Sequence, residues 1–339
     1  MAEPEVSTKA PESDADAQPT PEASTSSASP APSAPRMGDH CTSDRPTPAG
    51  QSSTGEITRL NDVEVYISKP ADYPHAQSRL LLLLTGGTGL HSVNNQIQAD
   101  RFAAEGYVVV MPDLFNGDPA PNTSAVTSEI AEVSSSGSLL DKLKVKAAEA
   151  AKSFLIDMWL ARHTEAKVLP ILHRVIDACK DEFADAVSHG GGIYAVGYCF
   201  GARYVLLLAA ERLPHPGVEA ETSAVAQRGS GDVEENKPPT VGPFIKAGAL
   251  AHATLVSKED FQGLKVPLSV VCVENDPLFP DEVRIAGEEY LNSHGVEHEV
   301  QVYPGVPHGF AVVGEYDDPT IKMAQATAYD QMLKWLNDH

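Results

Sequence analysis

A cysteine stands between two glycines in the stretch Gly197-Tyr198-Cys199-Phe200-Gly201. An apolar run at 193–196 precedes this stretch, and a run with helical character at 202–213 follows it. This is the nucleophile-elbow pattern, G-x-S-x-G, with cysteine in the place of serine. The glycines let a strand and a helix approach closely around a strained turn, and the N-terminus of the helix favours a thiolate. The pattern predicts a nucleophilic thiol at Cys199 and a thiol-dependent hydrolase.

A nucleophilic thiol needs a base and a group that orients the base. In the α/β-hydrolase order an acid and then a histidine follow the nucleophile, each on a loop after a later strand. Asp276 follows a predicted strand at 268–273, and His308 follows a predicted strand at 300–303. Open α/β sheets place their sites at the carboxyl ends of their strands, so we expect Cys199, Asp276 and His308 to lie together.

Two other acidic residues compete with Asp276 for the orienting role. Glu274 lies on the same loop, and Asp281 precedes a predicted helix and suits an N-cap. Asp276 itself stands before Pro277 and is also compatible with a simple turn. Asp276 is the preferred candidate.

The remaining cysteines and a histidine pair have weaker support as functional residues. Cys272 lies within a predicted strand and suits a buried core thiol, whereas Cys41 near the N-terminal tail and Cys179 in a predicted helix have no supporting context. His294 and His298 have i, i+4 spacing, but no carboxylate motif accompanies them. We therefore expect no metal site and no cofactor.

An oxyanion hole would complete the chemistry. The Phe200 N–H, directly after the nucleophile, is the expected first donor, and the Gly87 N–H, in the loop 85–89, is the expected second. A phosphate cradle is the alternative for this loop, but the loop lacks the Lys-Ser/Thr pair of a P-loop and the spaced glycines of G-x-G-x-x-G. Position on the loops alone suggests five residues of a substrate pocket: Thr88, Leu90, His91, Phe115 and Phe310.

Strands alternate with helices from about residue 56, which predicts an α/β fold with a mostly parallel sheet and helices on both faces. The predicted strands are 63–67, 79–84, 107–111, 193–196, 247–250, 268–273 and 299–303, and the predicted helical segments are 95–105, 139–186, 202–213, 282–293 and 321–336. Residues 1–36 are rich in Pro, Ser, Ala, Thr and acidic side chains, so we expect a disordered tail before one domain at 37–339. A polar, Gly/Pro-bearing stretch at about 214–243 is expected to be a surface insertion.

The composition of the chain limits the kinds of partner and compartment that we expect. A net charge of −22 argues against nucleic acid and anionic membrane surfaces. Four widely spaced cysteines without a C-x-x-C motif suit reduced thiols, and no apolar run of transmembrane length occurs. We expect a cytoplasmic monomer or homodimer whose partner is a small-molecule ester or lactone.

Four stretches, in order, carry a family resemblance: Gly106-Tyr107 with Pro112-Asp113-Leu114-Phe115, Val196-Gly197-Tyr198-Cys199-Phe200-Gly201, Asn275-Asp276-Pro277-Leu278-Phe279-Pro280, and Tyr303 with His308-Gly309-Phe310-Ala311. With them the chain resembles the dienelactone hydrolases (carboxymethylenebutenolidase-like proteins), cysteine members of the α/β-hydrolase fold, over about residues 40–337. The resemblance implies a Cys199–His308–Asp276 triad that hydrolyses an enol-lactone or a small ester.

Three positions depart from bacterial members of that family, which place a glutamate beside the resting thiol and two arginines around a substrate carboxylate. The corresponding positions here hold Gly86, Gly117 and Val312. The resemblance is therefore nearer to the eukaryotic dienelactone-hydrolase-like proteins. A non-catalytic protein that keeps the fold for ligand binding or scaffolding is the alternative function, and thioesters or acylated peptides are alternative substrates.

Overall fold

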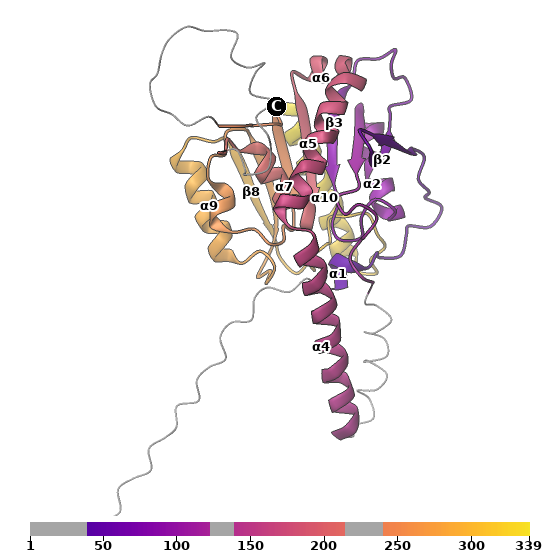
Figure 1. The fold of residues 1–339 in the computed structure, drawn as a ribbon, viewed down its shortest axis with the longest axis vertical. Helices are drawn as coiled ribbons and strands as arrows, with labels where there is room; N and C mark the ends of the chain where they lie inside the picture. Colours follow the sequence, from indigo (N-terminus) through magenta and orange to yellow (C-terminus); the bar gives the residue numbers. More distant parts are fainter. Residues whose placement is uncertain (1–38, 123–138, 214–239) are drawn as a thin grey trace, which may run out of the picture. The chain divides into compact units, whose positions relative to one another are not determined.

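The computed structural model describes residues 39–122, 139–213 and 240–339. In these residues one eight-stranded sheet has the order β1-β2-β4-β3-β5-β6-β7-β8 (Figure 1). Its strands are β1 (Glu56–Leu60), β2 (Val63–Ser68), β3 (Arg79–Leu84), β4 (Tyr107–Pro112), β5 (Ile193–Tyr198), β6 (Ala247–Ala251), β7 (Leu268–Val273) and β8 (His298–Tyr303). The β1–β2 and β2–β4 pairs are antiparallel and every other pair is parallel, which confirms the predicted α/β architecture.

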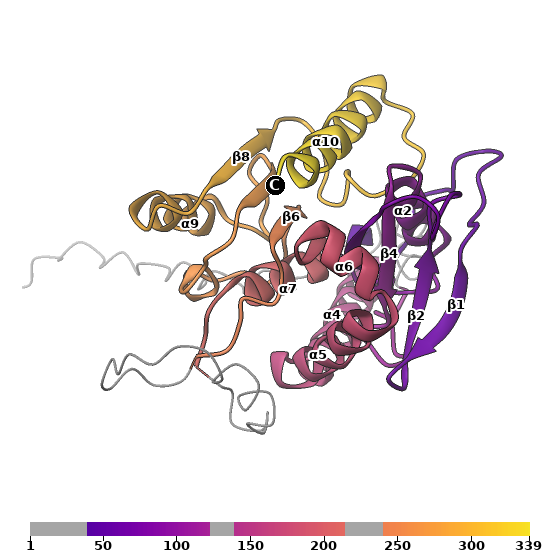
Figure 2. The ribbon, with the colours of Figure 1, turned by 90° about the horizontal axis from the view of Figure 1, so that it is seen from above.

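Helices cover both faces of the sheet, as Figure 2 shows. The helices are α1 (Asp39–Thr42), α2 (Val93–Ala104), α4 (Leu139–Arg162), α5 (Glu165–Glu182), α6 (Ala184–Gly190), α7 (Phe200–Ala209), α9 (Asp281–Ser293) and α10 (Pro319–Asp338), with a 3-10 turn, η2 (Lys258–Phe261). One buried cluster joins α2 and α10 to the sheet, and the other joins α5 and α7 to its opposite face. None of the helices in the described ranges is both long enough and apolar enough to cross a bilayer.

The leucine run of β3 shows why a continuous apolar strand lies at the centre of the sheet. Side chains on a strand alternate between its faces. Leu80, Leu82 and Leu84 therefore join the cluster with α5 and α7, whereas Leu81 and Leu83 join the cluster with α2 and α10. Both faces of β3 are covered, so no polar side chain is needed on either face.

The turn from β5 to α7 brings the helix against the neighbouring strand. A Cβ added at Gly201 would lie 2.2 Å from the Leu84 carbonyl oxygen, and one at Gly197 would lie 2.6 Å from the Val205 side chain. Arg203 on α7 donates hydrogen bonds to Asp260 of η2 and to Glu165 at the start of α5. These contacts fix where α7 begins: glycine lets its first turn lie directly against β3, and the hydrogen bonds of Arg203 hold the helix there.

Several boundaries differ from the sequence expectations. The edge strand β1 was not predicted, since its side chains are largely exposed and show no apolar alternation. The helix after the elbow ends at Ala209 rather than at 213, because Ala210 and Arg212 form bridges with Leu264 and Val241 instead. Helix α2 begins at Val93, with the Ser92 hydroxyl as its cap.

The expectation for Asp281 also needs correction. The N-cap of α9 is Pro280, and Asp281 is a residue of the first turn whose carboxylate accepts hydrogen bonds from Arg284. The predicted tail at 1–36 and residues 214–239 of the predicted insertion lie outside the described residues.

The contact at Gly201 generates a stability prediction. We expect Gly201→Ala to lower the free energy of unfolding by about 3 kcal/mol, because the added methyl meets backbone that cannot withdraw. Gly305→Ala is the matched control: Gly305 has φ +68° and nothing within 4 Å of the added Cβ, so that its cost is limited to left-handed backbone strain of about 1 kcal/mol. Urea unfolding monitored by circular dichroism measures both. Equal losses for the two variants would contradict the close contact.

Candidate active site

Cys199 occupies a strained position between β5 and α7. Its backbone has φ 50° and ψ −112°, a conformation that non-glycine residues rarely adopt. The surrounding backbone holds it: the Cys199 N–H donates to the Ala251 carbonyl at 3.1 Å, and its own carbonyl accepts from the N–H of Thr254 at 3.2 Å. The thiol is therefore presented at the N-terminus of α7 by contacts with the loop that follows β6.

His308 and Asp276 meet at the ends of β8 and β7, as the parallel sheet requires. The His308 Nδ1 lies 2.6 Å from the Asp276 Oδ2, and both side chains are buried. The second carboxylate oxygen of Asp276 accepts from the Leu278 N–H at 2.9 Å, which fixes the orientation of the carboxylate. Of the rival acids, Glu274 is exposed and Asp281 is paired with Arg284. Asp276 is thus the acid that contacts His308.

A threonine links the histidine to the thiol. The Thr254 Oγ1 lies 3.3 Å from the Cys199 Sγ and 3.3 Å from the His308 Nε2. No pattern in the sequence indicates Thr254, because it lies in an irregular loop after β6 and belongs to no motif. It is held there by the same backbone contact that supports the elbow, its N–H donating to the Cys199 carbonyl.

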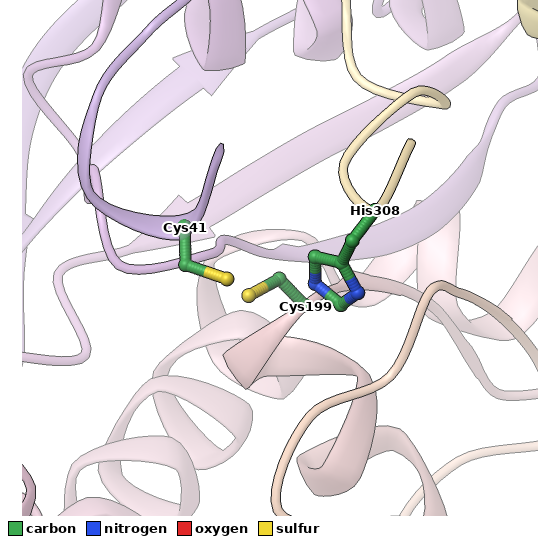
Figure 3. Close-up of side chains that lie close together, drawn as sticks. All are labelled: Cys41, Cys199 and His308. Carbon is green, nitrogen blue, oxygen red and sulfur yellow. The ribbon is translucent and has the colours of Figure 1, made fainter. Parts of the chain in front are cut away.

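Cys41 is the second residue that the sequence analysis did not bring to the site. Figure 3 shows its sulfur and that of Cys199 pointing toward each other, with the ring of His308 beside Cys199. One donor atom from each of these three side chains lies within 4.8 Å of the other two, and all three side chains are buried. Cys41 comes from α1, far away along the chain, so no local spacing could indicate the contact.

The environment of Cys199 and His308 favours their charged forms. Burial by itself would raise the pKa of the Cys199 thiol, but hydrogen bonds with Cys41, His308 and Thr254 and the charge of His308 hold that pKa well below its ordinary range. Burial acts to lower the pKa of His308, yet its hydrogen bonds with Asp276 and Cys199 raise it to about 9. Both shifts favour a thiolate–imidazolium pair over two neutral groups.

The glycine loop after β3 abuts the elbow. The Gly201 N–H donates to the Thr85 carbonyl at 3.0 Å, and the Gly87 carbonyl accepts from Ala120 at 2.8 Å. A Cβ added at Gly86 would lie 3.2 Å from the Cβ of Cys199. Phe200 is the first residue of α7, and the N–H groups of a first helical turn have no acceptor within their own helix. The loop and the helix start therefore border Cys199 from two sides.

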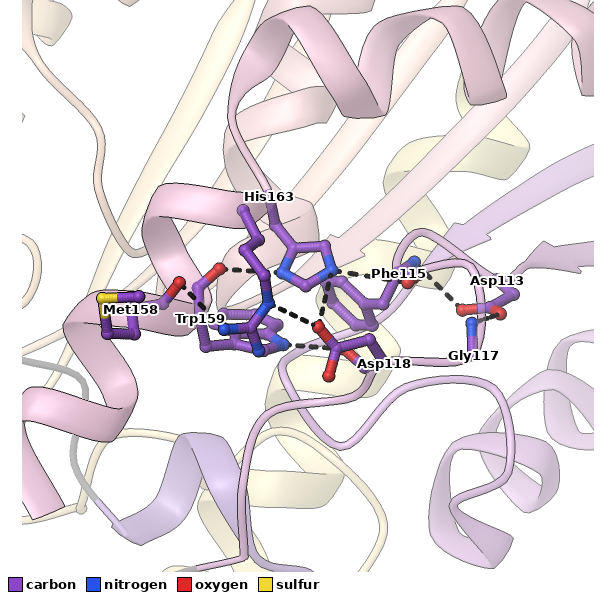
Figure 4. A network of polar contacts seen from close by, with 8 residues as sticks. Asp113, Phe115, Gly117, Asp118, Met158, Trp159 and His163 are labelled. Carbon is purple, nitrogen blue, oxygen red and sulfur yellow. Dashed lines mark hydrogen bonds and ion pairs between the residues drawn. The ribbon is translucent and has the colours of Figure 1, made fainter.

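An aromatic cluster packs behind the elbow. The Phe200 ring lies 5.2 Å from that of Phe115 and 5.4 Å from that of Trp159, centroid to centroid. Figure 4 shows how polar contacts fix this cluster: the Trp159 Nε1 donates to the Asp118 carbonyl, and the His163 ring contacts the carbonyls of Trp159 and Phe115. The end of α4 is thereby fastened to the loop after β4.

The cavity beside Cys199 has a volume of about 30 Å³, and Cys41, Asp44, Arg45, Thr88, Cys199 and Val312 are among its lining residues. Of the five predicted pocket residues, Thr88 is the one found in this lining. Leu90, Phe115 and Phe310 are core side chains, and His91 forms an exposed pair with Glu64 at 3.0 Å. Their contact with substrate stays a prediction.

A positively charged side chain, Arg45, also lines the cavity, and no pattern in the sequence indicates it. The guanidinium of Arg45 lies over the ring of Tyr316, 4.5 Å from its centroid. Two positions correspond to arginines in bacterial members of the family. Val312, at the first, lines the cavity, and Gly117, at the second, donates its N–H to Asp113. Arg45, from the segment after α1, thus places a guanidinium in the lining of this cavity.

The mostly parallel sheet and the cysteine at its strand-to-helix elbow define an α/β-hydrolase fold. Residues 63–339 match the model of the dienelactone hydrolase family, and the chain belongs to that family. It is accordingly an enzyme of the carboxylic ester and lactone hydrolase class.

Individual relatives agree with this membership. Hydrolase pyvD of Aspergillus violaceofuscus is 28% identical over 285 residues, which are 84% of this chain and 90% of that protein. Dienlactone hydrolase 1 of Gibberella moniliformis is 26% identical over 84% of this chain and 87% of its own length. Among solved structures, a thermophilic esterase from Thermogutta terrifontis shares the fold, with a TM-score of 0.53 and 15% identity over 83% of this chain and 92% of that chain.

The ionised pair generates a prediction about thiol reactivity. Alkylation of Cys199 by iodoacetamide should slow by no more than about threefold between about pH 8 and about pH 6, whereas an ordinary thiol loses most of its thiolate over that range. Cys179 and Cys272 are internal controls, because burial raises the pKa of each thiol to about 12. Mass spectrometry of the labelled peptides measures all three rates. A steep fall for Cys199 as the pH is lowered would contradict the ion pair.

Proposed function

We propose that this enzyme hydrolyses a small ester or enol-lactone through a thioester acyl-enzyme, with Cys199 as nucleophile, His308 as acid and base, and Asp276 as the group that orients His308. The observation that carries the proposal is the position of the His308 ring. Its Nδ1 lies 2.6 Å from the Asp276 carboxylate, and its Nε2 faces Thr254 and Cys199. A base held by a buried carboxylate and directed at a nucleophile is the arrangement that acyl transfer requires.

Acylation begins with the thiolate of Cys199. Its sulfur attacks the carbonyl carbon of the ester, and the electron pair of the carbonyl bond moves onto the oxygen. The N–H groups of Phe200 and Gly87 are proposed to stabilise this oxyanion. When the carbonyl bond forms again, the bond to the leaving oxygen breaks and His308 transfers its Nε2 proton to that oxygen. The products of this step are an alcohol, or the ring-opened enol of a lactone, and a thioester at Cys199.

Deacylation reverses the proton transfers with water in the place of the alcohol. The His308 Nε2, now neutral, accepts a proton from a water molecule whose oxygen attacks the thioester carbon. The carbon–sulfur bond then breaks, the carboxylic acid leaves, and the thiolate–imidazolium pair is restored. Asp276 stabilises the imidazolium in the resting state and whenever His308 holds the second proton.

Thr254 is proposed as a positioning residue for this pair. With its hydroxyl 3.3 Å from both the sulfur and the Nε2, it can donate to the thiolate while accepting from the imidazolium. Such a bridge supports the direct contact between the two charged groups and keeps their relative positions fixed. It also gives the proton a short path when the leaving oxygen replaces the threonine as partner of Nε2.

The substrate class follows from family membership, and the cavity adds a constraint. The cavity beside Cys199 has a volume of about 30 Å³, so little free space is available next to the sulfur. A small acyl group is therefore favoured over a long one. The same chemistry could also hydrolyse thioesters and acylated peptides. Hydrolysis rates measured side by side on a lactone, an aryl ester and an acyl thioester distinguish these substrate classes.

The first test is the dependence of hydrolysis on Cys199. We expect the wild type to hydrolyse p-nitrophenyl acetate and Cys199→Ala to lose at least about 10³-fold in kcat/KM, because no other group replaces the nucleophile. Cys179→Ala, which removes a buried thiol of α5 instead, should keep the wild-type rate. Activity that survives in Cys199→Ala would contradict the mechanism. If neither wild type nor variant hydrolyses esters, lactones or thioesters, a ligand-binding role becomes the better explanation.

The second test separates the hydroxyl of Thr254 from its shape. Thr254→Val keeps the volume but removes the bridge, and we expect kcat to fall by about tenfold. Thr254→Ser restores the hydroxyl and should return kcat to within about threefold of the wild type. The pH dependence of kcat distinguishes positioning from simple packing, because loss of the bridge alters the pKa values of the pair. Equal activity of the valine and serine variants would exclude the role proposed for the hydroxyl.

A further inference from the structure

The thiol of Cys41 has no reacting part in the proposed mechanism, yet it points at the nucleophile. Its sulfur, the sulfur of Cys199 and an imidazole nitrogen of His308 lie within 4.8 Å of one another (Figure 3). Cys41 and Cys199 are 2% and 3% exposed, and both line the small cavity. Two thiols and an imidazole that converge in a buried place form a donor set, which is more than a catalytic pair requires.

The chemistry of this donor set selects a soft or borderline divalent cation. Thiolate and imidazole together suit Zn²⁺, whereas Mg²⁺ and Ca²⁺ prefer oxygen ligands. Bond lengths of about 2.3 Å to sulfur and about 2.0–2.1 Å to nitrogen place the donors of a tetrahedral zinc site roughly 3.5–3.8 Å apart. The observed limit of 4.8 Å therefore requires side-chain movements of the order of 1 Å.

The surroundings of the donors also suit a metal. Because the His308 Nδ1 is bonded to Asp276 at 2.6 Å, the Nε2 is the nitrogen directed toward the sulfurs and Thr254. A carboxylate behind a ligating histidine is the usual outer contact of protein zinc sites. Two thiolates would balance the charge of one divalent ion, which satisfies the requirement for pairing in a buried place. The cavity of about 30 Å³ that Cys41 and Cys199 line has room for one water molecule at a fourth ligand position.

We propose that Cys41, Cys199 and His308 form a three-ligand site for Zn²⁺, with water at the fourth position. Binding forms two zinc–sulfur bonds and one zinc–nitrogen bond, and any proton still held by a thiol or by the Nε2 leaves to solvent. The same atoms serve as nucleophile and base, so an occupied site is an inactive hydrolase. The statement about inhibition rests on the proposed function, whereas the statement about metal binding does not.

The experiment uses the full chain, reduced with a phosphine and freed of metal by a chelator. Cd²⁺ serves as the optical probe, because cadmium bound to thiolate gives an ultraviolet charge-transfer band. Zn²⁺ is then titrated in competition with a chromophoric chelator, and p-nitrophenyl acetate hydrolysis is measured over the same Zn²⁺ range. The variants are Cys41→Ala and Cys272→Ala, which remove one buried thiol each; Cys272 belongs to β7 and is not a member of the three-donor cluster.

The expected result is one equivalent of Cd²⁺ with a thiolate band in the wild type and in Cys272→Ala. In Cys41→Ala we expect a weakened band and an apparent Kd for Zn²⁺ at least about 100-fold higher, because a direct ligand is lost. The Zn²⁺ concentration that halves hydrolysis should rise by the same factor, judged against the metal-free rate of each variant.

Two results would overturn the proposal. One is a wild type without a cadmium–thiolate band, and the other is a band and a Zn²⁺ affinity that Cys41→Ala leaves unchanged. If Cys199-dependent hydrolysis is present without the band, the zinc site fails and the proposed function stands. If the band depends on Cys41 but no ester is hydrolysed, the zinc site stands and the proposed function fails.

Discussion

The arrangement of the site depends on one constraint. At Gly201 the first turn of α7 lies directly against the end of β3. A Cβ at this position would lie 2.2 Å from the Leu84 carbonyl oxygen, and the Gly201 N–H donates to Thr85 at the start of the glycine loop. The contact holds the helix start, the loop and the strained Cys199 backbone as one unit. Without it, α7 would shift outward and the thiol would leave the edge where β7 and β8 deliver Asp276 and His308.

The site also has to stabilise the charges that it buries. Cys199, Asp276 and His308 are all buried, and buried charges are costly unless each has a partner. The chain meets this requirement through a continuous set of contacts: Leu278 N–H to Asp276, Asp276 to His308, and His308 to Thr254 and Cys199. The lowered pKa of Cys199 and the raised pKa of His308 have a common cause, because the charge on each group stabilises the charge on the other.

Two residues of the segment 41–45 contribute to the site in addition to the motifs that carry the family resemblance. Cys41 and Arg45 both line the cavity, Cys41 beside Cys199 and Arg45 over the ring of Tyr316. They bring a second sulfur and a positive charge to a place where Gly86 and Val312 provide neither. Residues outside the four stretches that carry the family resemblance can therefore influence substrate preference and the response to metal ions.

The α/β architecture was predictable from the sequence, because β3 and its neighbours are apolar on both faces and because β3, β4, β5, β7 and β8 are each followed by a helix. The sequence also indicated Cys199, Asp276 and His308, because the spacing of glycines and the position of a residue after a strand can be read from neighbouring residues. The exposed strand β1 and the early end of α7 were not predictable, because an edge strand lacks apolar alternation and the pairing of Ala210 with Leu264 is not local. Only the tertiary structure placed Thr254 between the sulfur and the imidazole and Cys41 against Cys199, because these contacts join segments whose separation along the chain leaves no pattern in the sequence.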